Sequence, residues 1–190
     1  MPTHWYNVVA DMPNPPAPPM GPDGKAVEPT SCPTLTRGPY AYDFGDAIGL
    51  TPLLKMHTPG HDFVPPGIHG GGLRYHGDSP LVSQLYHEGL VDAVAIPQLE
   101  TFEAGVLFAR TEGIVPGPES THAVAAAVRS ARECASSAES RTILFNLSGH
   151  GHFDMSAYDR YLNNELEDDE FPVAAIEESL SHLPEVLHQP

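Results

Sequence analysis

The segment 142–154 constrains the fold of this chain more than any other. Its first part, 142–147, is a short apolar run typical of a buried strand, and it breaks off into Ser148 and an alternation of glycine and histidine. A strand that ends in this way brings a hydroxyl group and bare backbone to one point. In α/β proteins, ligands bind outside the carboxyl ends of the strands, so we expect a small-cofactor site at this turn.

Apolar periodicity along the rest of the chain predicts a mixture of helices and strands. Side chains spaced three and four apart indicate helices, and short apolar runs rich in β-branched residues indicate strands. The predicted elements are helices at 81–89, 99–111, 119–137, 155–163 and 172–188 and strands at 92–97 and 142–147. This order is typical of an α/β fold with a few parallel strands and helices on the faces. Two strands are fewer than a stable sheet usually contains, which indicates part of a larger architecture.

The stretch 42–80 is rich in glycine, histidine and proline, which predicts long irregular loops with one brief helical pattern near 50–57. His57 and His61 are four residues apart, but the Pro-Gly pair between them prevents a shared helix face. None of the 11 histidines falls into a compact zinc-ligand spacing, so no metal site is expected. The three glycines at 70–72 are expected to form a turn rather than a phosphate cradle, because no lysine follows them.

The acidic balance of the chain excludes several partners. The sequence carries 25 acidic and 9 basic residues, for a net charge of −16, which repels nucleic acid and anionic membrane surfaces. No apolar run reaches membrane-spanning length and the start of the chain resembles no export signal, so we expect a cytoplasmic protein. Cys32 and Cys134 are expected to be unpaired thiols in a reducing compartment. The acidity fits a high-salt (halophilic) cytoplasm and an ordinary acidic protein equally well.

Proline and acidic residues suggest how the chain is divided. Residues 1–40 contain about half of the 21 prolines, which predicts an extended, polyproline-like N-terminal arm. The acidic run at 165–170 is typical of a solvated linker. We therefore expect a Pro-rich arm at 1–40, an α/β part at 41–165, and an acidic linker with a C-terminal helix at 166–190.

Four long stretches together carry a specific resemblance. They are THWYNVVADMPNPPAPP (3–19), CPTLTRGPYAYDFGDAIGLTPLLKMHTPGHDFVPPGIHGGGLRYHG (32–77), FEAGVLFARTEGIVPGPESTHA (102–123) and ILFNLSGHGHFD (143–154). The chain resembles the tryptophan synthase β-like family, in particular its longer archaeal-type β chains. The resemblance implies part of a pyridoxal phosphate (PLP) fold type II, with PLP as cofactor. It further implies L-serine and indole as family substrates, and either a β-chain homodimer or a full-length β subunit as partner.

The resemblance also assigns roles to particular residues. Ser148 would contact the pyridine nitrogen of PLP, with Asn146, Gly149 and Gly151 shaping the same turn, and Glu119 would lie near the ring. A neutral hydroxyl leaves that nitrogen unprotonated, which favours replacement at Cβ of serine over transamination. The start of a helix favours the charge of Glu119. Taken alone, Glu119 is equally well an ordinary first-turn acid, and Ser148 is more typical of a strand-end turn.

Full family members contain a region that this sequence lacks between the arm and the CPTLTRG stretch. That region holds the lysine that bonds the cofactor, a glycine-rich phosphate cup and a loop for the substrate carboxylate. Lys25 and Lys55 match no family lysine, and PLP chemistry requires one. The sequence therefore leaves three alternatives open: a truncated form without independent catalysis, a binding or regulatory module that docks on a full-length β subunit, and one half of a split enzyme.

Overall fold

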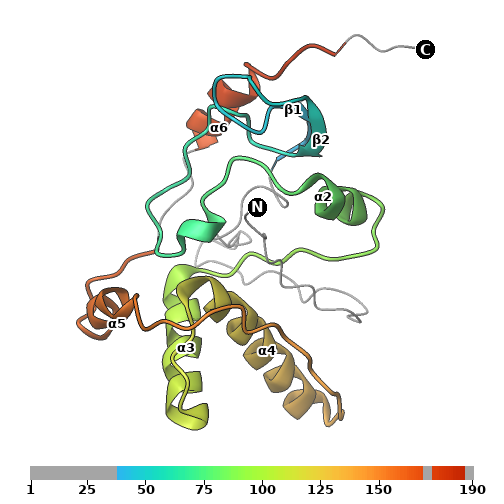
Figure 1. Cartoon of the computed structure of the whole chain (residues 1–190). Coiled ribbons are helices and arrows are strands. Elements are labelled where there is room, and N and C mark those ends of the chain that lie inside the picture. Colours follow the sequence, from blue (N-terminus) through green and yellow to red (C-terminus); the bar gives the residue numbers. More distant parts are fainter. Residues whose placement is uncertain (1–37, 169–172, 187–190) are drawn as a thin grey trace, which may run out of the picture. The chain divides into compact units, whose positions relative to one another are not determined.

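The computed structural model describes residues 38–168 and 173–186 (Figure 1). These residues belong to two compact units. The described part of unit 1 comprises 38–94 and 173–186, and that of unit 2 comprises 95–168. The proline-rich arm expected at 1–40 lies almost wholly outside the described residues. The domain boundaries expected near 41 and 166 stay predictions.

Unit 1 contains two short antiparallel strands, β1 (Tyr40–Asp43) and β2 (Leu54–His57), with Tyr40 opposite His57. The helical pattern near 50–57 was therefore wrong, because its second half is strand β2. Pairing with β1 satisfies the backbone groups of β2 and overrides a weak local preference. The burial of β2 increases along its length, so that Met56 and His57 are buried while its first two residues are exposed.

Helix α2 (Pro80–His87) packs against β2. Proline is favourable in the first turn of a helix, where its missing amide has no partner to lose. The side-chain oxygen of Ser83, which is fully buried, accepts the backbone amide of His57 at 3.0 Å and so joins the helix to the strand. Gly89, at φ +69°, follows the helix, as expected for the element at 81–89. The glycines at 70–72 form a turn as expected, with a single 3-10 turn, η1, at Gly71–Leu73.

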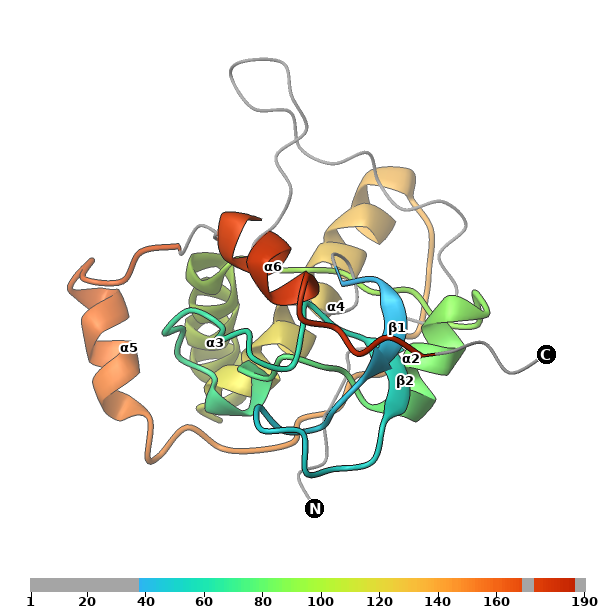
Figure 2. The ribbon, with the colours of Figure 1, turned by 90° about the horizontal axis from the view of Figure 1, so that it is seen from above.

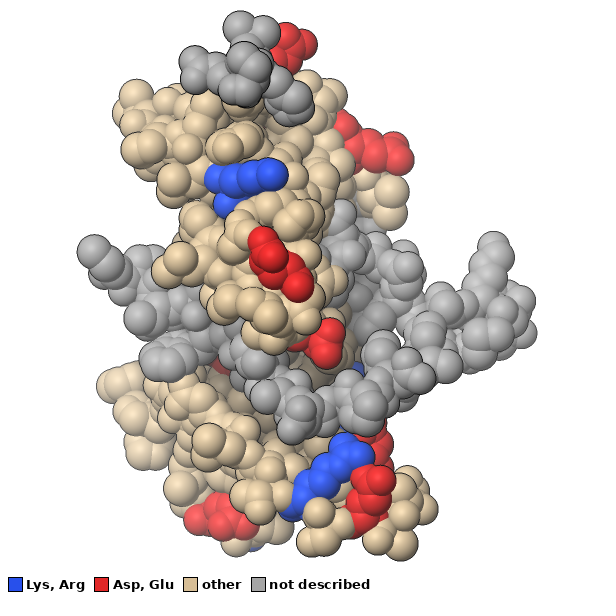
Figure 3. All heavy atoms as spheres, turned by 90° about the vertical axis from the view of Figure 1, so that its right-hand side faces the viewer, with Lys and Arg blue, Asp and Glu red and all other residues tan. Residues whose placement is uncertain are grey.

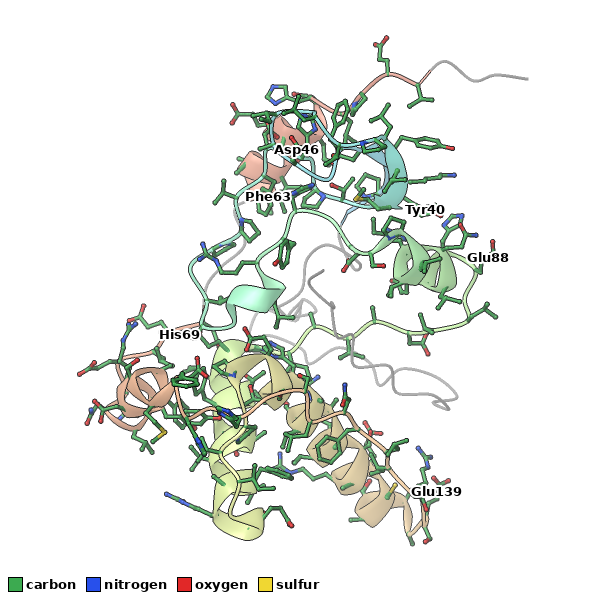
Figure 4. The ribbon with its side chains drawn as sticks, viewed as in Figure 1. Tyr40, Asp46, Phe63, His69, Glu88 and Glu139 are labelled. Atoms are coloured by element: carbon green, nitrogen blue, oxygen red, sulfur yellow. The ribbon has the colours of Figure 1, made fainter. Side chains whose placement is uncertain are left out.

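Asp46 organises the connection between β1 and β2 (Figure 4). Its carboxylate accepts the backbone amides of Ile48, Leu50 and Thr51 at 3.0, 3.1 and 2.6 Å. These hydrogen bonds, led by the one from Leu50, lower the pKa of Asp46 to about 2. The charged acceptor therefore holds a turn whose apolar side chains Ile48 and Leu50 are exposed.

Helix α6 (Val173–Leu180) belongs to unit 1 and packs on the loop that follows β2. Ser179 donates a hydrogen bond to one oxygen of Asp62, and His182 Nδ1 lies 2.6 Å from the other. The bond from Ser179, followed by the contact with His182, lowers the pKa of Asp62. The helix expected over 172–188 is confirmed at 173–180 and is wrong at 181–186, while 172, 187 and 188 lie outside the described residues. Pro184 has no amide and disfavours helical backbone at the residue before it, so the helix does not continue.

Unit 2 is mainly helical. Its helices are α3 (Gln98–Glu112), α4 (Pro118–Ser137) and α5 (Met155–Leu162), which confirms the elements expected at 99–111, 119–137 and 155–163. Both views show α3 lying beside α4, and α3 also contacts α5 (Figures 1 and 2). Gly113 ends α3 in the left-handed conformation, at φ +72°. Within the described ranges, no helix is long and apolar enough to cross a membrane.

Two apolar clusters stabilise unit 2. One contains Ile96, Ala104, Val124, Ala125 and Ala126, and the other contains Phe102, Ala157, Tyr158 and Leu166. Gly105 lies where α3 approaches its neighbours most closely. A Cβ atom there would lie 2.7 Å from Thr121 Cγ2 and 2.8 Å from the Tyr158 hydroxyl oxygen. The small residue therefore sets how closely the helices pack.

The two parallel strands expected at 92–97 and 142–147 are absent as regular strands. The described strands are instead the antiparallel pair of unit 1, so the α/β class is confirmed while the expectation of parallel strands there was wrong. The apolar residues of both segments are buried only in part. Ala95 and Ile96 are buried, with Ile96 in the first cluster, and Phe145 and Leu147 pack against that cluster, whereas Val94 and Leu144 are exposed. A strand is defined by backbone hydrogen bonds to a neighbouring strand, and neither segment is paired with another strand among the described residues.

Candidate functional site

The turn that contains Ser148 is attached to the segment that leads into α4. The Gly117 amide donates to the Gly149 carbonyl oxygen at 2.9 Å, and the Gly151 amide donates to the Val115 carbonyl oxygen at 2.7 Å. Between these bonds, Pro116 and His150 form an isolated antiparallel bridge. The structure therefore brings the expected turn at 148–151 to the start of α4, as two short extended pieces.

Ser120, in the first turn of α4, connects the helix to the turn through its side chain. Its hydroxyl is 2.9 Å from the Ser148 hydroxyl and accepts the Gly149 amide at 3.0 Å. With the Gly149 amide as its donor, the Ser120 oxygen can give its own proton to Ser148. Ser148, which is exposed, then keeps its proton for a ligand. The hydroxyl expected to contact a cofactor thus lies against a buried neighbour, 2 % exposed, and either of the two hydroxyls can be the donor.

Glu119 precedes Ser120 in the first turn of α4 and is half-buried. The unpaired amides at a helix start favour a negative charge there. One turn later, burial lowers the pKa of His122, whereas Pro118 and Glu119 oppose that shift. His122 Nδ1 donates to the Pro118 carbonyl oxygen at 3.1 Å, and its Nε2 has no hydrogen-bond partner among the described residues. The N-terminal end of α4 therefore combines the carboxylate of Glu119 with the neutral, buried imidazole of His122.

The other expected site residues differ in what surrounds them. Asn146 is exposed on the same side of the extended segment as Ser148. Gly149 has open space where a Cβ would be. Gly151 is buried, and a Cβ there would lie 2.5 Å from the Pro116 carbonyl oxygen and 3.1 Å from Tyr158 Cε2. Gly151 is therefore required for the close approach of the turn to the α4 segment.

We expect Gly151→Ala to lower the free energy of unfolding by about 2 kcal/mol, because a backbone carbonyl must move to admit the new methyl group. Gly149→Ala is the matched control, two residues away in open space, and is expected to change stability by less than about 0.5 kcal/mol. Chemical denaturation followed by circular dichroism measures both. Equal effects of the two substitutions would contradict the packing described at Gly151.

Tyr158 supports the same segment from α5. Its hydroxyl donates to the Pro116 carbonyl oxygen at 2.6 Å, and burial raises the pKa of this phenol. Neither Tyr158 nor Ser120 is recognisable as a site residue from the sequence. Ser120 does carry one local signal, since serine in the first turn of a helix often bonds backbone groups. No local signal links it to Ser148, because the two are 28 residues apart.

A model of one protein family matches residues 25–149, and its description is "Pyridoxal-phosphate dependent enzyme". The chain is 66% identical over 143 residues to "Tryptophan synthase beta chain 2" of Aquifex aeolicus, covering 75% of this chain and 33% of that protein. The chain belongs to the tryptophan synthase β-like family of pyridoxal-phosphate dependent enzymes. Pyridoxal phosphate is the cofactor of this family, and the family match together with the α/β fold supports PLP fold type II.

Two more relatives of the same name agree with this assignment. The protein of Methanosarcina acetivorans is 62% identical over 141 residues, covering 74% of this chain and 32% of that protein. The protein of Thermotoga maritima is 58% identical over 133 residues, covering 70% of this chain and 32% of that protein. The chain thus spans about a third of the length of the curated relatives it matches.

The described part of unit 2, residues 95–168, offers a cofactor the Ser148 hydroxyl but no lysine. A hydroxyl such as that of Ser148, which lies 2.9 Å from the Ser120 hydroxyl, has the chemistry to donate to an unprotonated pyridine nitrogen. The covalent link to the cofactor needs a lysine, and residues 95–168 contain none. Lys55 lies in β2 of unit 1, where its Nζ sits 4.6 Å from the centre of the Tyr40 ring in a cation–π contact. Lys25 lies outside the described residues.

Among residues 38–168 and 173–186, no group of three histidine, cysteine or carboxylate side chains is placed to hold a metal ion. His57 and His61 have separate roles in unit 1. His61 Nδ1 lies 2.8 Å from the buried carboxylate of Asp43, and His57 Nδ1 donates to the Gly38 carbonyl oxygen at 2.8 Å. Both imidazoles therefore serve the local packing of the strand pair.

Proposed function

We propose that this chain is a truncated tryptophan synthase β-like protein that carries the pyridine side of a PLP site and does not by itself join L-serine and indole into L-tryptophan. The hydrogen-bonded group of Ser120, Ser148 and the Gly149 amide is the observation that carries this proposal. It supports a preformed contact for a ring nitrogen. The lack of a lysine in residues 95–168 supports the absence of independent catalysis.

When bound in this family, PLP supplies an electron sink for bond changes at the Cα and Cβ atoms of an amino acid. The part of this chain in that chemistry is limited to binding and orientation. Ser148 would donate one hydrogen bond to the ring nitrogen and leave that nitrogen neutral. Glu119 would place a negative charge near the ring, where the start of α4 stabilises it. Asn146, Gly149 and Gly151 would shape the turn that holds these groups.

A second candidate function is supported by the extended segment 142–147, which has no neighbouring strand among the described residues. In this alternative the chain is a non-catalytic module that docks on a full-length β subunit, or one half of a split enzyme. A partner in either role would supply the lysine and the phosphate cup. The match to only about a third of each relative supports this alternative as well.

We further propose a cytoplasmic location in a high-salt environment. The supporting observation is the net charge of −16, with acidic side chains spread over the visible face rather than gathered in one patch (Figure 3). Dispersed like charges repel one another at low ionic strength, and salt screens that repulsion at separations beyond about 10 Å at 0.1 M and at shorter separations as the salt concentration rises.

Borohydride trapping tests the proposed lack of catalysis. The purified chain is incubated with PLP, reduced with borohydride and mapped by peptide mass spectrometry, and indole consumption is measured in the presence of L-serine. We expect no stoichiometric adduct on Lys25 or Lys55 and no turnover of indole. A stoichiometric adduct on Lys55 together with turnover by this polypeptide alone would contradict the proposal. Lys55→Arg keeps the charge beside Tyr40 and serves as the control for incidental labelling.

A further inference from the structure

The segment 142–147 has the side-chain geometry of a strand without the backbone pairing of one. Burial alternates along it: Ile143, Phe145 and Leu147 are half-buried, whereas Leu144 and Asn146 are exposed. Phe145 and Leu147 pack against the first apolar cluster of α3 and α4, and the Phe145 ring meets Phe108 edge-on at 5.8 Å. One face of an extended segment therefore rests on two helices, which is how a sheet strand is covered in α/β folds.

The backbone of this segment is not paired within the described part of the chain. No hydrogen bond joins an amide or carbonyl group of 142–147 to another described residue. The first paired group after it is the Gly149 amide, which donates to Ser120. Leu144, on the outward face, is 92 % exposed. Unpaired backbone groups in an apolar extended segment are a ready template for an added strand.

We propose that 142–147 is a docking edge that accepts an extended strand of a separate polypeptide, namely one that carries the portion of the relatives which this chain does not match. The inference deepens the second candidate above and rests on the proposed function. It gives that partner a location on this chain: the backbone edge of one segment beside α3 and α4. The match to only about a third of the relatives' length supports a partner that carries the rest of that length.

The chemistry of the segment limits what can bind there. Residues 142–149 contain no charged side chain, so a strand laid along them buries no charge of this chain. Leu144 offers an apolar contact on the outward face, which favours a partner strand with apolar side chains at alternate positions. The net charge of −16 disfavours an acidic partner and a second copy of this chain. The occupant is therefore an apolar strand without acidic residues.

The test uses a defined probe. This is the β chain 2 of Aquifex aeolicus, expressed without the 143-residue region that this chain matches. The two polypeptides are mixed at several molar salt, and backbone hydrogen exchange of this chain is measured by mass spectrometry with and without the probe. We expect the two polypeptides to elute as a complex in size-exclusion chromatography. We also expect hydrogen exchange at 142–147 to slow by roughly tenfold or more, since hydrogen bonds to a paired strand protect these amides from exchange.

A matched pair of substitutions separates backbone pairing from side-chain contact. Leu144→Pro removes one amide from the exposed edge, whereas Leu144→Ala removes the exposed side chain and keeps the amide. We expect Leu144→Pro to weaken binding by roughly tenfold or more and Leu144→Ala by no more than about threefold. Helical circular dichroism checks that both variants keep the fold of the free chain.

Several results would overturn the inference. They are the absence of a complex, equal binding by the two variants, slower exchange at another site only, slow exchange at 142–147 already in the free chain, or self-association through this segment. Failure of the proposed function is distinguishable, because it would be seen as PLP bonded to this chain and turnover by this chain alone. A complex that protects 142–147 from exchange but has no activity would support the docking edge. It would refute the split-enzyme alternative alone.

Discussion

Phe102→Ala is expected to lower the free energy of unfolding of unit 2 by about 4 kcal/mol. Phe102 is 0 % exposed and lies in the second apolar cluster, where its ring meets Tyr158 edge-on at 5.1 Å and stacks on Tyr161 at 5.7 Å. Removal of the ring leaves a cavity between α3 and α5. The same change loosens Tyr158, whose hydroxyl holds Pro116 next to the Ser148 turn.

Phe153→Ala is the matched control, because this phenylalanine also belongs to unit 2 and is 91 % exposed. It is expected to change stability by less than about 0.5 kcal/mol. Urea denaturation at fixed high salt, followed by circular dichroism, compares the two variants with the parent chain. Similar unfolding midpoints for both variants would show that the second apolar cluster does not carry the stability of unit 2.

Gly60→Ala is expected to destabilise unit 1 by about 3 kcal/mol, from two causes that act together. Gly60 has φ +112°, a backbone conformation that residues with a Cβ rarely adopt. A Cβ there would also lie 2.1 Å from Ser179 Oγ and 2.7 Å from the Ser179 carbonyl oxygen. Helix α6 would have to move away from the loop, and the hydrogen bond from Ser179 to Asp62 would be lost.

Gly67→Ala provides the control in the same loop region, since nothing lies within 4 Å of the Cβ position there. Its effect on stability is expected to be below about 1 kcal/mol in either direction. Hydrogen exchange of α6 distinguishes the two variants: faster exchange at 173–180 is expected for Gly60→Ala alone. Unchanged protection of α6 in that variant would contradict the contact between Gly60 and Ser179.

The candidate site was partly predictable from the sequence. The break after 142–147 marked Ser148, and the family resemblance marked Glu119. The structure brings their two segments together through Gly117, Gly149 and Gly151. Their roles toward a cofactor stay predictions. Ser120 was not predictable, because its importance comes from a contact with a residue 28 positions away.

Local patterns determined the helices of this protein, and tertiary structure decided its strands. Helices α3, α4 and α5 follow from apolar spacing and end signals because each backbone bond closes within four residues. A strand needs a partner that the local sequence does not specify, so 54–57 became β2 by pairing with β1, while 142–147 stayed extended and unpaired. For the same reason, only the folded chain shows that Ser120 contacts Ser148 and that the backbone of 142–147 is unpaired among the described residues.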